Sequence, residues 1–110
     1  MSTDADAIFA FMRREVPWSN RHALDLSVDL RGTLRMIQED VEEIIPDFFQ
    51  EFRIDPGDFD LGRYFTFDAF SPISFRRKEP ELVPLTLGML LHAARLGVWK
   101  TAEIEAAARP

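Results

Sequence analysis

The sequence predicts an all-α or mainly α protein, a small bundle of about four helices, and three observations lead to this fold class. Four segments carry apolar residues at the spacing of an amphipathic helix. No two segments pair convincingly as β-strands. With 110 residues, the chain is long enough for one hydrophobic core but short for two. We therefore expect residues 1–110 to form a single helical domain.

The first predicted helix begins close to the N-terminus, where residues 3–6 read Thr-Asp-Ala-Asp and resemble a capping box. In this interpretation the Thr3 hydroxyl accepts an amide hydrogen bond, and Asp6 lies near the positive end of the helix. The apolar residues that follow at helical spacing are Ala5, Ile8, Phe9, Met12 and Val16. Pro17 is predicted to end the helix.

A connector runs from Trp18 to about Gly32, and its apolar residues alternate with polar ones. These apolar residues are Leu24, Leu26, Val28 and Leu30. Alternation of this kind is typical of a strand, but a strand needs a partner to be stable and no second clear strand is present. We interpret the connector as an extended loop that packs on the helices.

The second predicted helix shows the strongest periodicity. Its apolar residues fall within one sector of a helical projection: Leu34, Ile37, Val41, Ile44, Ile45, Phe48 and Phe52. Pro46 lies inside the pattern, where a proline removes one backbone hydrogen bond. Because the apolar sector keeps its phase across Pro46, we predict a kinked helix. The alternative is two abutting helices, the latter with Pro46 in its first turn.

The next part of the chain is predicted to be a turn, a short helix and a long loop. Asp55–Asp58 reads Asp-Pro-Gly-Asp, a typical turn composition. A short aromatic helix is predicted for residues 59–65. Residues 66–85 contain three prolines and the basic cluster Arg76–Lys78, which indicates a long loop, with or without a small β-hairpin around residues 73–75 and 82–83.

Two further helices are predicted at the C-terminal end. Thr86 is placed to cap a helix and Gly97 to end it. Between them, one face carries the apolar residues Leu87, Leu90, Leu91 and Ala94. Residues 100–108 are rich in Ala and Glu, which favours a terminal helix.

Composition and charge disfavour several classes of function. The net charge of −6 repels phosphate backbones and anionic membranes, so we expect neither nucleic acid nor membrane as a partner. The absence of cysteine excludes disulfides and thiolate nucleophiles. No apolar run approaches the ~20 residues that span a bilayer, and the acidic N-terminus lacks the features of a secretory signal. We therefore expect a cytoplasmic protein.

The order of these elements, with an acidic helix ending "EEIIPDFFQEFRID", resembles an acyl carrier protein. More closely, the chain is similar to a bacterial family of uncharacterised proteins, DUF1493, with an acyl-carrier-like core. The segments that carry this similarity are residues 48–65, especially "FRIDPGDFDLGRYF", and residues 85–99. The resemblance implies an acyl-carrier-like helical bundle and names no activity.

The serine that a carrier protein requires is absent. The resemblance implies that this serine, which bears the phosphopantetheine arm, should stand at the start of the second helix, at Gln38 or an adjacent residue. A helix N-terminus is well suited to receive the phosphate of that arm. Gln38, Glu39 and Asp40 offer no hydroxyl, and Ser27 lies eleven residues before Gln38, in the predicted loop. We therefore expect no phosphopantetheine and no other cofactor.

The sequence contains no pattern typical of a catalytic or metal site. His22 lies in the predicted loop, and His92 falls opposite the apolar face of its helix, where we expect it to be solvated. The acidic residues lack the looped spacing of an oxygen-ligand cage, and phosphate-binding and nucleophile motifs are missing. We expect no catalytic residue, no metal ligand and no enzyme activity.

The best candidate interaction surface is the acidic side of the second helix. Four carboxylates share one flank of the apolar sector, with two more at the margin, and the six are Glu39, Asp40, Glu42, Glu43, Asp47 and Glu51. The first hypothesis is a non-catalytic binding module that docks through these residues onto a basic partner protein, as an immunity-type inhibitor or an accessory subunit. The alternative for the surface is a solvated face that only keeps the protein soluble.

The second hypothesis is an atypical acyl or peptidyl carrier whose arm is attached to another hydroxyl, such as that of Ser27 or Thr33.

Overall fold

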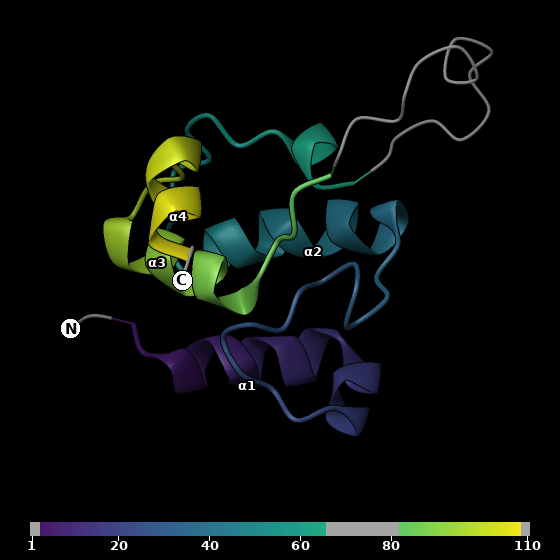
Figure 1. The fold of residues 1–110 in the computed structure, drawn as a ribbon. Helices are drawn as coiled ribbons and strands as arrows, with labels where there is room; N and C mark the ends of the chain where they lie inside the picture. Colours follow the sequence, from purple (N-terminus) through teal and green to yellow (C-terminus); the bar gives the residue numbers. More distant parts are fainter. Residues whose placement is uncertain (1–2, 66–81, 109–110) are drawn as a thin grey trace, which may run out of the picture.

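The computed structural model describes residues 3–65 and 82–108 and shows a mainly α fold (Figure 1). Within these ranges the elements are α1 (Ala5–Glu15), the 3-10 turn η1 (Pro17–Arg21), α2 (Gln38–Glu51), the 3-10 turn η2 (Leu61–Arg63), α3 (Leu87–Leu96) and α4 (Thr101–Ala108). Extended pairing among the described residues is limited to two isolated bridges, Asp29 with Thr86 and Asp55 with Val98. The predicted bundle of about four helices is confirmed.

Helix α1 begins one residue later than the capping pattern suggested. The cap is Asp4, whose Oδ1 accepts the Ala7 N–H at 3.0 Å, and the prediction that Thr3 caps the helix is wrong. The Thr3 carbonyl instead accepts a hydrogen bond from Arg95 Nε at 2.9 Å, which ties the N-terminal segment to α3. The helix ends at Glu15, as predicted from Pro17, which opens η1.

The connector between η1 and α2 is a loop, as predicted, and its partner segment lies far away in the sequence. Leu30 N–H donates to the Leu85 carbonyl at 2.9 Å, and Leu87 N–H donates to the Val28 carbonyl at 3.0 Å. Val28 and Leu30 are buried by this contact, whereas Leu26 is 42 % exposed. The alternation in the sequence therefore marks a loop that runs along the start of α3.

Helix α2 is a single helix from Gln38 to Glu51 with Pro46 inside it. The alternative of two abutting helices is wrong. The predicted apolar sector extended too far toward the N-terminus, because Arg35 has a positive φ of 53° and Ile37, at the N-cap, is 56 % exposed. The helix continues past Pro46 because residues on both sides of it are buried: Val41, Ile44, Ile45, Phe48 and Phe49.

The turn after α2 is confirmed. Asp55 Oδ1 accepts the Gly57 N–H at 2.9 Å, and Phe59 N–H donates to the Pro56 carbonyl at 2.9 Å. Gly57 has a φ of +54°, and a Cβ at this position would lie 2.1 Å from the Trp99 carbonyl oxygen, so only glycine fits. The short aromatic helix predicted for residues 59–65 is reduced to η2.

Both helices predicted at the C-terminal end are present. Thr86 Oγ1 accepts the Met89 N–H at 3.2 Å at the start of α3, and Gly97 ends it with a φ of 79°. Figure 1 shows α4 folded back beside α3. Most of the hairpin considered for residues 66–85 lies outside the described residues. In the described part, Val83 N–H donates to the Arg63 carbonyl at 3.1 Å.

Aromatic side chains fill the core around α2. On one side Phe48 meets Phe11 of α1, with ring centroids 5.5 Å apart. On the other side Phe49 meets Phe59 at 5.3 Å, and Phe59 meets the fully buried Trp99 at 4.9 Å. These edge-to-face contacts hold α2 between α1 and the segment that carries η2. No helix in the described part of the chain is long and apolar enough to cross a membrane.

Candidate functional site

The six predicted partner-binding carboxylates all lie on α2, but they do not share one environment. We call this set the acidic face: Glu39, Asp40, Glu42, Glu43, Asp47 and Glu51. All are exposed except Asp40, which is half-buried. Within the described residues, no hydrogen bond or ion pair engages the carboxylates of Glu39, Glu43 and Asp47, so these three are free to meet a partner.

The other three carboxylates have partners inside the protein. Asp40 Oδ2 accepts the Ile37 N–H at 3.0 Å, which satisfies an amide at the start of α2, where a carboxylate is also favoured by the helix dipole. Glu42 Oε1 accepts a hydrogen bond from Gln38 Nε2 at 2.9 Å. Glu51 forms an ion pair with Arg14 of α1. These contacts give Asp40 and Glu51 local structural roles.

Arg14 connects the end of α1 to the end of α2. Its guanidinium pairs with Glu15 at 3.0 Å and also with Glu51, and it lies 5.4 Å from the centre of the Phe11 ring. The hydrogen bonds from the Glu15 and Glu51 carboxylates raise the pKa of Arg14 above its ordinary value. Arg14 therefore neutralises the C-terminal end of the acidic face and leaves the N-terminal part with most of its charge.

Three carboxylates of the acidic face converge on a small hollow of about 180 Å³. Asp40, Glu43 and Asp47 line it from α2, and Glu15 and Trp18 line it from the end of α1 and from η1. Trp18 Nε1 donates to the Leu34 carbonyl at 2.7 Å, which fixes the indole, and the residue is 36 % exposed. We call this hollow the acidic hollow. An aromatic wall beside carboxylates is a suitable environment for a basic side chain.

Sequence reasoning did not identify Trp18 or Glu15 as part of this surface. Both residues precede the long loop that leads to α2. Nothing in the local sequence indicates that this loop folds back and brings α2 next to them. The available signal was an indole directly after the Pro17 helix stop, a position where a large aromatic residue often packs against a neighbouring element.

A second, apolar hollow of about 410 Å³ lies between α2 and the segment that leads into η2. We call it the apolar groove, and its apolar lining includes Val41, Ile45, Phe49, Pro56, Phe59 and Leu61. Glu42 and Pro46 also line it. The acidic face thus borders two hollows. Asp40, Glu43 and Asp47 line the acidic hollow, and Glu42 lines the apolar groove.

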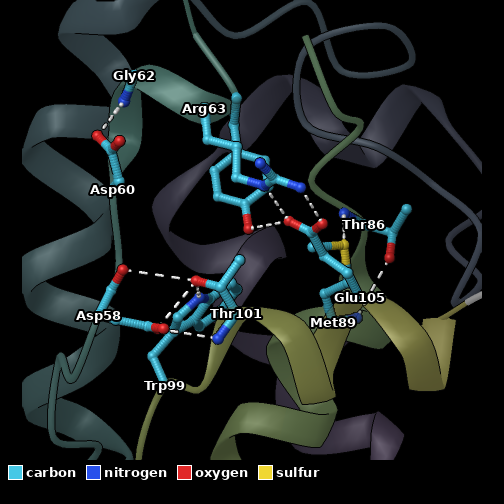
Figure 2. Close-up of polar contacts among 10 residues, drawn as sticks. Asp58, Asp60, Gly62, Arg63, Thr86, Met89, Trp99, Thr101 and Glu105 are labelled. Atoms are coloured by element: carbon cyan, nitrogen blue, oxygen red, sulfur yellow. Dashed lines mark hydrogen bonds and ion pairs between the residues drawn. The ribbon is translucent and has the colours of Figure 1, made fainter.

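A polar network joins α4 to the segment around η2 (Figure 2). The Glu105 carboxylate, in a residue only 8 % exposed, accepts hydrogen bonds from Arg63 Nε at 2.5 Å and Nη2 at 2.6 Å, and from the Tyr64 hydroxyl at 2.8 Å. Nearby, Asp58 Oδ1 accepts the Thr101 N–H and hydroxyl, each at 2.9 Å. The network joins α4 to the segment around η2 and is satisfied internally.

The Tyr64 hydroxyl in this network has a pKa raised above its ordinary value. Burial of the phenol is the main cause, followed by the hydrogen bond to Glu105 and the charge of that carboxylate. A phenol with a raised pKa stays protonated and donates a hydrogen bond at neutral pH. The network therefore acts as a structural brace between α4 and the η2 segment.

The two histidines lie on different elements, His22 at the end of η1 and His92 in α3. His22 is exposed in the loop. The prediction that His92 is solvated is wrong, because the residue is only half exposed and its Nε2 atom is buried without a hydrogen-bond partner among the described residues. His92 lines a third hollow of about 450 Å³ that also includes Ser27 and Arg95. Across residues 3–65 and 82–108, no three His, Asp or Glu side chains are grouped as metal ligands would be.

The two hydroxyls considered for a carrier arm lie in the loop that precedes α2. Ser27 Oγ donates to the Asp25 carboxylate, and hydrogen bonds from Ser27 lower the pKa of Asp25. Thr33 Oγ1 accepts the Asp29 N–H at 3.4 Å. The residue at the N-cap of α2 is Ile37, which has no hydroxyl.

The fold and this surface define a small, mainly α protein with an acidic helix. The chain belongs to the family described as protein of unknown function (DUF1493), which matches residues 1–101. No curated protein matches the chain, and no solved structure does.

Proposed function

We propose that this protein is a non-catalytic binding module that docks onto a basic surface of a partner protein through the acidic face of α2. The observation that carries the proposal is the set of free carboxylates at Glu39, Glu43 and Asp47, two of which line the acidic hollow beside Trp18. These three side chains contribute no internal hydrogen bond or ion pair within the described residues.

Electrostatic complementarity favours this kind of partner. The chain has a net charge of −6, and charges at the rim of an interface steer association and suppress wrong partners. Trp18 adds an apolar contact surface beside these charges. A fixed, partly exposed indole is the type of residue that contributes most to the binding energy of an interface. A cytoplasmic immunity-type inhibitor and an accessory subunit both fit this surface, and the partner's own function distinguishes them.

The test begins with a pull-down from the native cell and identification of the captured protein by mass spectrometry. The purified partner is then titrated with the wild-type protein and with the double variant Glu43→Lys/Asp47→Lys at low and moderate salt. We expect binding to weaken by about tenfold or more in the variant, since like charges then face each other. We also expect wild-type binding to weaken as salt rises, because exposed charges are screened over ~10 Å at 0.1 M salt.

A matched control changes the charge by the same amount elsewhere. Asp6→Lys/Glu103→Lys reverses two exposed acids on α1 and α4. This control should bind within about twofold of wild type apart from the general effect of net charge. Glu43→Lys/Asp47→Lys should unfold close to the wild-type temperature, because exposed charges contribute little to folding. The control should unfold at a slightly lower temperature, because Asp6 and Glu103 lie in the first turns of α1 and α4, where the helix dipole favours a carboxylate. Equal affinities for wild type and Glu43→Lys/Asp47→Lys at both salt concentrations would reduce the acidic face to a solvated surface.

A further inference from the structure

The apolar groove is already formed in the protein. Phe49 and Phe59 pack edge to face at 5.3 Å, and Phe59 is held in turn by Trp99 at 4.9 Å. Ile45 and Phe49 are 4 % and 8 % exposed, so they form a buried part of the wall and do not move freely. A volume of about 410 Å³ lies in the range of about 300–1,000 Å³ that is usual for ligand sites. An apolar group can therefore enter without rearrangement of the core.

Acidic residues of α2 lie at the groove and next to it. Glu42 is one of the residues that line the groove, and Glu39 lies one turn earlier on the same side of α2. Pro46 also lines the groove and has no N–H, so the Glu42 carbonyl receives no hydrogen bond from the residue four positions later. A group that enters the groove thus meets an apolar wall with acidic residues of α2 beside it.

We propose that the apolar groove receives apolar side chains of an amphipathic basic helix on the partner protein, a proposal that rests on the docking function stated above. The apolar stripe of such a helix fills the groove, and its basic residues lie against Glu39 and Glu42. The charge at the groove excludes an acidic or anionic occupant. It also disfavours a second copy of this chain, because a symmetric contact would place the acidic face of one molecule against that of the other.

The apolar and electrostatic contributions can be separated with two synthetic peptides. The first is a helical peptide of leucine and lysine with all leucines on one face. The second has every leucine replaced by glutamine and keeps the charge. Each is labelled with a fluorophore and titrated by fluorescence anisotropy. Wild-type protein should bind the leucine peptide about tenfold or more tightly than the glutamine peptide, because only leucine can fill the groove.

Leu61→Ser tests the groove, because Leu61 is a half-buried apolar residue of its wall. This variant should bind the leucine peptide about as weakly as the glutamine peptide. Leu26→Ser is the matched control, because Leu26 is 42 % exposed and lies beside the start of α3, outside the groove. It should keep the wild-type preference. Circular dichroism checks that both variants are folded.

A measurement on the wild-type protein removes any dependence on the folding of Leu61→Ser. With methyl labelling, nuclear Overhauser effects should connect the leucines of the peptide to the methyl groups of Val41, Ile45 and Leu61. Effects that map instead to another surface, or no preference for leucine over glutamine, would overturn the proposal. Self-association of the protein alone that Leu61→Ser abolishes would also overturn it, in favour of a second copy as the occupant.

The same titrations separate this proposal from the docking function. Glu43→Lys/Asp47→Lys should weaken both peptides together and leave their ratio unchanged, because these residues line the acidic hollow and not the groove. If the charge reversal leaves both affinities unchanged while the leucine preference persists, the groove proposal is supported and docking through the acidic face is contradicted. If the charge reversal weakens binding and no leucine preference exists, docking through the acidic face is supported and the groove proposal is contradicted.

Discussion

At the scale of single residues, Glu105 shows how one buried carboxylate positions a whole segment. It accepts two hydrogen bonds from Arg63 and one from Tyr64, across 42 and 41 residues of sequence. A buried carboxylate without partners is costly, so the three donors make its burial possible. They also fix the backbone on one side of the apolar groove, because Leu61 belongs to the same 3-10 turn as Arg63.

Tyr64 provides a direct test of this network, since it is the only tyrosine in the chain. Burial and the Glu105 carboxylate raise its pKa in the folded protein. The ultraviolet absorption of the phenolate should therefore appear at higher pH in the native protein than in urea, where the ordinary value of about 10 applies. Glu105→Gln should move the native midpoint toward that value, because the carboxylate no longer opposes the phenolate.

The raised pKa also gives stability a pH dependence of known sign. The folded state holds the Tyr64 proton more tightly than the unfolded state does. Its contribution is therefore complete below the unfolded pKa of about 10 and is lost as pH rises above it toward the folded pKa. Urea unfolding should show a larger loss of stability between pH 9 and pH 11 in wild type than in Tyr64→Phe, whose ring has no proton to lose. An equal loss would contradict the buried hydrogen bond.

At the scale of elements, α2 carries the candidate site and contains the least favourable residue for a helix. Pro46 lies in its ninth position, between Gln38 and Glu51, where proline costs about 3 kcal/mol relative to alanine. The helix is continuous because its buried apolar face packs on both α1 and the η2 segment. Pro46 is exposed, so its contacts contribute little to the core.

Pro46→Ala should therefore stabilise the protein by about 2 kcal/mol, the helix cost less the ~0.4–1 kcal/mol by which proline restricts the unfolded chain. The urea midpoint measures this change. Pro56→Ala is the matched control, because Pro56 lies in a turn and not in a helix. At this position the substitution only gives the unfolded chain more conformational freedom, so Pro56→Ala should destabilise the protein by about 0.4–1 kcal/mol. A destabilised Pro46→Ala variant would mean that the proline ring at the groove matters more to folding than the missing hydrogen bond.

At the scale of the whole molecule, the parts that could be predicted are those specified locally. The Pro17 stop, the Thr86 cap and the Gly97 end depend on residues within one or two turns, and all three are confirmed. The start of α2 was misplaced because Leu34 fits the helical spacing yet is buried as part of the loop. The spacing of apolar residues indicates which side chains are buried, and buried residues of a loop can by chance have the spacing of a helix.

The surface was less predictable than the fold, because it depends on contacts between distant segments. The six acids of α2 were identified from spacing alone, and the structure places Asp40, Glu43 and Asp47 together around one hollow. Trp18 and Glu15 also line that hollow. They lie beside α2 because the loop between η1 and α2 packs along residues 85–88 and brings α2 back to them. The pairing of Glu51 with Arg14, across 37 residues, was invisible for the same reason.

The covalent state of the molecule decides between the docking function and the carrier alternative. A carrier arm needs a hydroxyl at the N-terminus of the helix, where backbone amides can receive its phosphate. Here α2 begins after Ile37, and Ser27 and Thr33 lie in the preceding loop, where Ser27 is bonded to Asp25 and Thr33 to the backbone of Asp29. We therefore expect no modification when the protein is incubated with coenzyme A and a phosphopantetheinyl transferase of broad specificity.

Intact mass spectrometry measures the result, with an authentic carrier protein in the same tube to show that the transferase is active. The expected spectrum shows the unmodified mass of this protein beside a fully modified control. A gain of one phosphopantetheine arm, mapped by peptide fragmentation to Ser27 or Thr33, would contradict the prediction. The loop that carries both hydroxyls would then be the functional segment, and the free carboxylates of Glu39, Glu43 and Asp47 would serve the recognition of carrier-modifying enzymes instead of a stable partner.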